Sequence, residues 1–195
     1  MDQFTGGTPG GVIDTAVEEV LAAAQEAGAE TTKIYLIDEH IEFCRNCRSC
    51  TQEPGDGHGV CPTEDDMARL LELVGQHDAL VLASPMNFFT VTAVMKRFIE
   101  RLVCFAYWPW GAPGPKIRTP EKQKRAVVVA SSAAPSLLAR PFTRTVRLLK
   151  QAAGLLGGRT VGVLFIGMAA MEESPRLAES TRRRARRIGK KLVSG

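Results

Sequence analysis

Short apolar runs alternate along this chain with longer segments of helical pattern, and this alternation limits the fold more than any other feature. The runs ALVLASP (79–85), RAVVVASS (125–132) and RTVGVLFIGM (159–168) are nearly continuous in Val, Leu, Ile and Ala. Such runs are typical of strands that are buried on both faces of a parallel sheet. Strands that alternate with helices form right-handed βαβ units. The pattern therefore predicts an α/β fold built on a doubly wound parallel sheet.

The segments around these strands supply the remaining elements. Residues 11–28 are rich in Ala, Glu and Leu and end at Gly28, so we expect a helix that stops there. TTKIYLID (31–38) is rich in β-branched and aromatic residues and predicts another strand. Pro141 is expected to disturb the early part of one further helix. The other predicted helices span 65–77, 92–105, 135–156 and 177–192.

Length and composition suit one domain that spans 1–195. A chain of 195 residues with 45% hydrophobic composition can bury one sizeable core. Five cysteines, no signal segment and no apolar run of about 20 residues predict a cytoplasmic protein without a disulfide framework or a membrane partner.

The net charge of +4 conceals an acidic first half and a basic second half. Much of the basic excess lies in TRRRARRIGKK (181–191). Apolar residues recur at helical spacing through this segment, which indicates a helix with one buried stripe and a solvated basic face. No nucleic-acid motif accompanies the charge, so we expect no nucleic-acid partner.

Three loops at the expected ends of strands are unusual, and ligands of open α/β sheets bind outside those ends. In SPMNFFT (84–90) a proline, an asparagine and two aromatic residues precede a helix. SSAAPS (131–136) is a run of small residues that lets a flat ligand approach the backbone. TGGTPGG (5–11) is a glycine-rich turn before a helix, an arrangement that holds a phosphate on backbone N–H groups.

The stretch ALVLASPMNFFTVTAVMKRFIERL (79–102) resembles the strand–SPxYFxxxxAxxKxFIDR stretch of the flavodoxin-like NAD(P)H-dependent FMN reductases and their iron–sulfur flavoprotein relatives. Asn87 and Phe88 stand where that family often has Tyr and Phe. The cysteine-rich segment CRNCRSC with the later CPTEDDM resembles the same relatives, in which such a loop ends in a "DDM" helix. The resemblance covers nearly the whole chain and implies a flavodoxin-like three-layer sandwich.

By this resemblance, FMN lies across the strand ends, with its phosphate in the glycine-rich loop and its ring against the SPMNFF loop. The residues implied at the phosphate are Thr5, Thr8, Gly10 and Gly11. Those implied along the ring are Pro85, Met86, Asn87, Phe88, Phe89 and Thr90, with Ser131, Ser132 and Ala133 at its other edge. Each loop alone has a structural interpretation, as core aromatics or as a turn and helix cap. Their joint occurrence at strand ends favours the site.

The start of the chain departs from the family pattern. Only MDQF precedes the glycines, whereas the family has a buried strand of greater length, so we expect a truncated first strand. Val12 and Ile13 stand where the family has polar phosphate ligands, which leaves the side chains of Thr5 and Thr8 for that role. We hypothesise that the true start lies upstream of Met1.

The cysteine-rich loop, residues 44–61, holds four thiols: Cys44, Cys47, Cys50 and Cys61. The CxxCxxC spacing suits an iron–sulfur cluster whose fourth ligand comes from farther along. Zinc, with His58 available as a ligand, and thiols without metal are the alternatives. The insert TQEPGDGHGV before Cys61 either reaches round to the other thiols or fails to. Cys104 lies in an apolar helical pattern and is interpreted as a packed core thiol.

The resemblance implies an FMN-dependent NAD(P)H oxidoreductase, with FMN as cofactor and NAD(P)H as co-substrate. Its electrons would pass to a small-molecule acceptor such as a quinone, a flavin or a nitro compound, directly or through an iron–sulfur cluster. No side-chain general base is required, so His40, His58 and His77 receive no catalytic role. The alternative is a flavodoxin-fold protein that has lost flavin binding and serves as a metal-binding or interaction module.

The segment CFAYWPWGAPGPKIRTP (104–120) is rich in aromatic residues and proline. We expect it to cover the flavin or to contact another subunit, and we predict a homodimer or homotetramer. The sequence leaves open the electron acceptor and the preference for NADH or NADPH.

Overall fold

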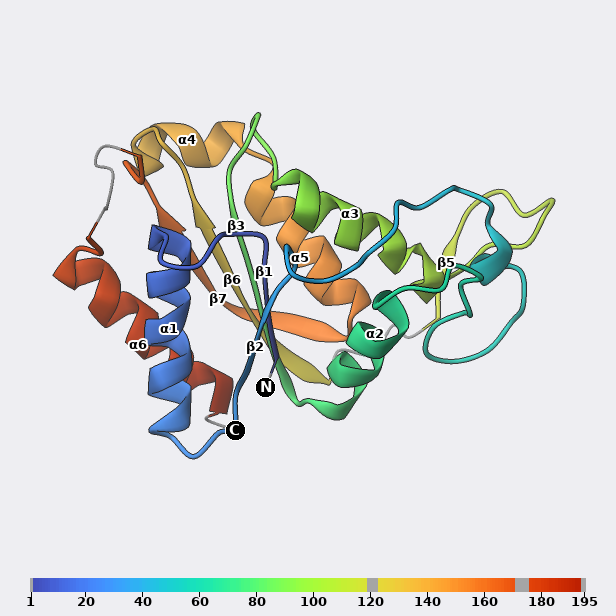
Figure 1. The fold of residues 1–195 in the computed structure, drawn as a ribbon, viewed down its shortest axis with the longest axis horizontal. Helices are drawn as coiled ribbons and strands as arrows, with labels where there is room; N and C mark the ends of the chain where they lie inside the picture. The colour runs from blue at the N-terminus through green and yellow to red at the C-terminus, as the bar shows by residue number, and fades with distance from the viewer. Residues whose placement is uncertain (1, 119–122, 171–175, 194–195) are drawn as a thin grey trace.

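The computed structural model describes residues 2–118, 123–170 and 176–193, and a five-stranded parallel sheet forms its centre (Figure 1). The strand order is β2-β1-β3-β6-β7, and every neighbouring pair is parallel. This order reverses between β1 and β3, as in the flavodoxin-like doubly wound fold. The predicted fold class is therefore confirmed. The strands are β1 (Asp2–Thr5), β2 (Thr32–Tyr35), β3 (Ala79–Pro85), β6 (Lys124–Ser131) and β7 (Gly158–Ile166).

Helices cover both faces of the sheet and complete three layers (Figure 1). One face is covered by α1 (Val12–Gln25) and α6 (Glu179–Val193). The opposite face is covered by α2 (Met67–Gln76), α3 (Ala93–Arg101) and α5 (Thr145–Leu155). The short helix α4 (Ser136–Phe142) lies near the ends of the strands rather than on a face.

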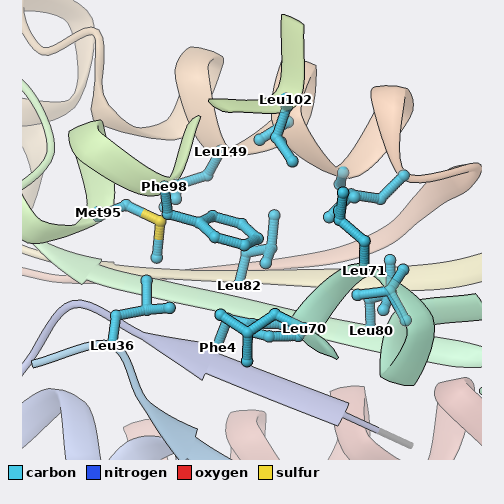
Figure 2. Packing of buried hydrophobic residues seen from close by; sticks show 14 of the residues in the cluster. Phe4, Leu36, Leu70, Leu71, Leu80, Leu82, Met95, Phe98, Leu102 and Leu149 are labelled. Carbon is cyan, nitrogen blue, oxygen red and sulfur yellow. The ribbon is translucent and has the colours of Figure 1, made fainter. Parts of the chain in front are cut away.

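The core under α2, α3 and α5 anchors the first strand (Figure 2). The ring of Phe4 is fully buried and stacks on Phe98 with 5.2 Å between ring centroids. Phe4 also lies in register with Ile34 of β2 and Leu82 of β3. The first strand is short, as predicted, but its flanking strands and this buried ring hold it inside the sheet.

Close backbone contact joins α1 and α6 on the other face. A Cβ atom on Gly189 would lie 2.2 Å from the carbonyl oxygen of Val20, so only glycine permits this approach. On the outer side, Arg186 pairs with Glu19 at 3.4 Å and with Glu26 at 2.5 Å. Part of the basic excess of the terminal helix is thus paired with acidic groups of α1 at the surface, where solvent screens the interaction.

Several predicted elements differ from those observed. The strand predicted over 31–38 ends at Tyr35. The helix predicted over 92–105 ends at Arg101 and is followed by a 3-10 turn, Leu102–Phe105. The helix predicted over 135–156 is divided into α4, which contains Pro141, and α5. The division falls where Thr143 is extended and its hydroxyl accepts from the amide of Thr145 at 3.0 Å.

A small antiparallel hairpin within 104–120 was not predicted. It pairs β4 (Ala106–Tyr107) with β5 (Lys116–Ile117), while residues 119–120 lie outside the described residues. Strands of two residues are too short to leave a periodic signal in the sequence.

Candidate functional site

A cavity of about 280 Å³ opens at the carboxyl ends of β1, β3 and β6, where the strand order reverses. This is the position at which doubly wound sheets bind their ligands. The lining includes eight of the residues that the sequence implied: Thr8, Gly11, Pro85, Met86, Asn87, Ser131, Ser132 and Ala133. The structure therefore brings all three unusual loops together around one space.

Sequence reasoning missed a fourth loop of this cavity. Ala169 and Ala170, which follow β7, line it together with Gly7, Val12 and Ile13. Ligands of open α/β sheets bind outside the carboxyl ends of the strands, and this rule also covers the loop after the strand predicted at 159–168. The position of that strand could therefore have indicated this loop.

Backbone hydrogen bonds tie these loops to one another. The amide of Met86 donates to the carbonyl of Ser131 at 2.8 Å, and the amide of Ala169 donates to the carbonyl of Ser132 at 2.9 Å. The hydroxyl of Ser84, buried beneath the β3 loop, accepts from the amide of Thr92 at 3.1 Å. The walls of the cavity are consequently fixed by main chain, and small side chains leave its interior open.

The glycine-rich loop ends at the N-terminus of α1, beside the cavity. Gly11 is the N-cap residue and provides no side-chain cap, and the first-turn amides of an α-helix have no partner inside their helix. Thr5 is buried under the loop, and its hydroxyl accepts from the amide of Gly7 at 3.0 Å. Thr5 and Gly10 do not line the cavity, so their contribution is to shape the loop.

A buried carboxylate, Asp14, lies in the first turn of the same helix. It accepts from the amide of Gly10 at 2.8 Å and from the hydroxyl of Tyr35 at 2.8 Å, and it pairs with Lys33 at 2.5 Å. Burial raises the pKa of Asp14, but the hydrogen bonds from Lys33, Gly10 and Tyr35 outweigh it, and the pKa lies below its ordinary value. The ionised carboxylate therefore holds Gly10, whose φ is 76°, in its left-handed conformation.

Phe88 and Phe89 form the tip of a two-residue turn beyond β3. The amide of Asn87 donates to the carbonyl of Thr90 at 2.9 Å, and the reverse bond is 3.0 Å. Both aromatic residues have positive φ, 45° and 62°, which is the pattern of a type I′ turn. Their side chains are 97% and 66% exposed, and neither they nor Thr90 line the cavity.

The cysteine-rich loop packs against the β4–β5 hairpin, near the end of α3 that is farther from the cavity (Figure 1). The guanidinium of Arg48 is sandwiched between Trp108 and Trp110, 3.9 Å and 4.2 Å from their ring centroids. Arg118 donates to the carbonyl of Cys50 at 3.2 Å. The aromatic segment thus covers the cysteine-rich loop.

The insert before the fourth cysteine packs against the backbone of Cys50 and Cys104. The amide of Gly59 donates to the carbonyl of Cys104 at 2.8 Å. A Cβ on Gly59 would lie 1.8 Å from the carbonyl oxygen of Cys50. The backbone of the insert therefore packs against Cys50 so closely that only glycine fits at position 59. Cys61 lines the same small cavity as Cys104, about 210 Å³ in volume.

The thiols influence one another electrostatically. Burial raises the pKa of Cys50, and the neighbouring thiols Cys61, Cys44 and Cys47 raise it further. Burial raises the pKa of Cys104 to about 12, again with contributions from Cys50 and Cys61. Cys104 is buried as the sequence indicated, but its place beside the other thiols could not be read from its helical pattern.

The sequence profile of the NADPH-dependent FMN reductases matches residues 4–169 of this chain. The chain belongs to the NADPH-dependent FMN reductase family.

Two curated relatives are iron–sulfur flavoproteins. One from Archaeoglobus fulgidus is 34% identical over 98 residues, which cover 50% of this chain and 40% of the relative. One from Methanocaldococcus jannaschii is 34% identical over 93 residues, which cover 48% of this chain and 46% of the relative. The chain therefore matches less than half the length of each of these relatives.

Solved structures share the reductase fold over almost the entire chain. An FMN-dependent NADH-azoreductase from Bacillus anthracis, in complex with FMN, has a TM-score of 0.72 at 12% identity and covers 100% of both chains. An NAD(P)H:quinone oxidoreductase from Methanothermobacter marburgensis has a TM-score of 0.70 at 20% identity, with 98% and 97% covered. At these identities the likeness shows the fold alone.

The cavity of this FMN reductase family member fits the cofactor of its family. An uncapped helix N-terminus offers amides to a phosphate dianion, and small residues leave room for a flat ring. Its volume is near the lower end of small-molecule sites, so it would enclose part of FMN and leave an edge accessible. Among the described residues, the lining contains no titratable side chain.

The cysteine-rich loop carries four thiols, a donor set that iron–sulfur clusters and tetrahedral zinc both use. Within the described residues, no three His, Cys, Asp or Glu side chains lie close enough together to hold one metal ion. Tetrahedral zinc requires all its thiolates at about 2.3 Å from one ion. A cubane iron–sulfur cluster takes four thiolates. By donor type, the four thiols of the loop fit such a cluster.

The described helices include none that is long and apolar enough to cross a membrane.

Proposed function

We propose that this protein is an FMN-dependent NAD(P)H oxidoreductase that passes electrons to a small-molecule acceptor of quinone or flavin type. The observation that supports this most is the cavity at the β1/β3 reversal, which gathers eight of the residues implied for FMN. The residues of this cavity would hold FMN, which would supply the redox chemistry between a nicotinamide and the acceptor. Such chemistry requires no side-chain acid or base, in agreement with a lining that contains none among its described residues.

The phosphate end of the site would be held mainly by backbone. The amides of Val12 and Ile13 begin α1, and the hydroxyl of Thr8 lies on the same side of the cavity. The partial positive charge of a helix N-terminus favours a dianion there. Asp14 and Lys33 form a neutral pair behind the loop, so the carboxylate adds little net repulsion.

The ring end would be shaped by main chain and small residues. Ser131, Ser132 and Ala133 form one wall, and Pro85 and Met86 form another. Phe88 and Phe89 stand at the rim in a turn that places both aromatic rings in solvent. We propose that they close over the exposed edge of the ring.

We also propose that Cys44, Cys47, Cys50 and Cys61 hold an iron–sulfur cluster, which when bound would carry single electrons. Support comes from the four free thiols in one loop and from the insert, whose Gly59 packs against the backbone of Cys50 two residues before Cys61. The contacts of Trp108 and Trp110 with Arg48 hold the backbone of the loop against the aromatic segment.

A homodimer or homotetramer is a further part of the proposal. Large apolar side chains are exposed near the mouth of the cavity and on the aromatic segment, as expected of a surface that another subunit covers: Phe88, Leu137, Leu138, Phe142 and Trp110. Light scattering at micromolar concentration should give at least twice the monomer mass, and a monomer would contradict this part.

Binding of FMN tests the main proposal directly. After anaerobic purification, the protein should be yellow or brown, quench FMN fluorescence on titration and oxidise NAD(P)H in the presence of a quinone. Ala133→Trp places a large side chain in the cavity and should abolish binding, whereas the adjacent Ala134→Trp, outside the lining, should not. If the wild-type protein does not bind added FMN, the proposal is refuted. Bound iron without flavin would then favour a metal-binding module.

A further inference from the structure

We infer that Arg101 is a positioning residue for the iron–sulfur cluster, donating a hydrogen bond to the sulfur of Cys61 and raising the reduction potential of the cluster. This inference rests on the cluster part of the proposed function. It assigns to the last residue of α3 a role that the cysteine motif itself does not indicate.

The guanidinium of Arg101 is buried and held at three points. Its side chain is 3% exposed, and the partner carboxylate of Asp65 is fully buried. Both terminal nitrogens contact Asp65, with 3.2 Å between Nη2 and Oδ1. Nη1 also donates to the carbonyl of Glu42 at 2.9 Å. Nη2 in addition lies 3.5 Å from the sulfur of Cys61.

Asp65 fixes the guanidinium from the other side. Its oxygens accept the amide of Glu42 at 2.8 Å and the amide of Met67 at 3.0 Å. Glu42 precedes the cysteine-rich loop and Asp65 follows it, so the ion pair joins the two ends of the loop. Arg101 consequently has a single orientation, and that orientation directs an N–H at Cys61.

The chemistry of the donor favours an anionic sulfur. A neutral thiol is a weak acceptor, whereas a thiolate bound to iron accepts a charge-assisted hydrogen bond from a guanidinium. Among the thiols that the structure describes, only Cys61 receives a bond from a cationic side chain; Cys47 accepts from the hydroxyl of Ser49 at 3.4 Å. Hydrogen bonds to cluster sulfurs and nearby positive charge stabilise the reduced, more negative form and raise the potential.

The experiment compares full-length variants after anaerobic reconstitution with iron and sulfide. Arg101→Met removes the positive charge and the N–H donors. Arg101→Lys keeps the charge but loses the planar guanidinium with its directed N–H donors. Arg97→Met is the matched control: it removes the same charge one turn earlier on α3, where the guanidinium lies 5.6 Å from the ring centroid of Phe43. Iron and sulfide per chain are measured first. The midpoint potential then follows from dithionite titration monitored by electron paramagnetic resonance.

We expect the wild-type protein and Arg97→Met to share one midpoint potential, Arg101→Lys to lie lower, and Arg101→Met to lie lowest. A wild-type protein that assembles no cluster overturns both the cluster proposal and this inference. A cluster that forms in every variant with unchanged potential overturns the inference alone. If Arg101→Met fails to fold, Arg101→Lys decides, because a potential equal to that of Arg97→Met refutes the role of the directed N–H.

Discussion

Replacing Phe88–Phe89 by Asn–Gly should stabilise the protein and weaken its flavin binding. Both residues have positive φ in a two-residue turn, where asparagine and glycine are the preferred pair. Their side chains are 97% and 66% exposed, so the folded protein without flavin gains little from them. A bulky residue in this conformation is strained, and such strain persists where function requires it.

The expected stabilisation follows from three contributions. Left-handed backbone costs about 1–2 kcal/mol per residue, so relief at two positions contributes about 2–4 kcal/mol. The entropy of glycine removes about 0.5–1 kcal/mol, and the buried third of Phe89 accounts for up to about 1 kcal/mol more. A net gain centred on about 2 kcal/mol remains, which raises Tm by roughly 4–8 °C in a chain of this size.

Thermal and urea unfolding of the protein without flavin measure the first effect, and fluorescence titration with FMN measures the second. The double variant Phe88→Leu with Phe89→Leu is the control, since it keeps the strained backbone and removes the aromatic rings. It should bind FMN more weakly without any gain in stability. A destabilised Asn–Gly variant, or one that binds FMN as tightly as the wild-type protein, would show that the turn is not a strained flavin contact.

Three other perturbations test the remaining architecture. Gly59→Ala forces a Cβ against the carbonyl of Cys50, so it should lower the free energy of unfolding by about 1–3 kcal/mol and reduce bound iron. The control Gly75→Ala, whose Cβ would lie in open space, should change that free energy by at most about 1 kcal/mol. Equal urea midpoints for the two variants would contradict the close contact between Gly59 and Cys50. Phe98→Ala removes the ring stacked on Phe4 and should lower the free energy of unfolding in urea by about 3–5 kcal/mol. A smaller decrease would mean that neighbouring core side chains fill the space left by the ring. The pKa of Asp14 is depressed because its hydrogen bonds from Lys33, Gly10 and Tyr35 outweigh burial. The ionised carboxylate therefore stabilises the fold fully above about pH 4, the pKa of an aspartate in the unfolded chain. This stabilisation is lost as pH falls through the lower pKa of the folded state. Asp14→Asn should therefore flatten the acid limb of unfolding free energy against pH, and an unchanged limb would refute this.

Local sequence signals anticipated the elements whose pattern is strong and continuous. The strand 79–85 was predicted with its observed bounds, because seven nearly unbroken apolar residues suit a strand buried on both faces. The helix after the glycine-rich loop was recognised from its composition and terminal Gly28. Short elements such as β4 and β5 leave no periodicity and were missed.

The meeting of the loops could also be anticipated, since the carboxyl ends of parallel strands share one edge of a sheet. The contribution of Ala169 and the outward placement of Phe88 depend instead on how the last turns of separate strands are bonded to one another. Such bonds connect residues far apart in the chain, and neither residue type signals them.

The sequence by itself determined the parallel α/β architecture, the family resemblance and the presence of four thiols in one loop. Only the tertiary structure decided that the insert packs against the backbone of Cys50, that Cys104 lies beside it and that Arg101 faces a sulfur. The physical reason is that hydrophobic periodicity reports which side of an element is buried. Which side chains then meet across that buried space depends on the packing of the whole chain.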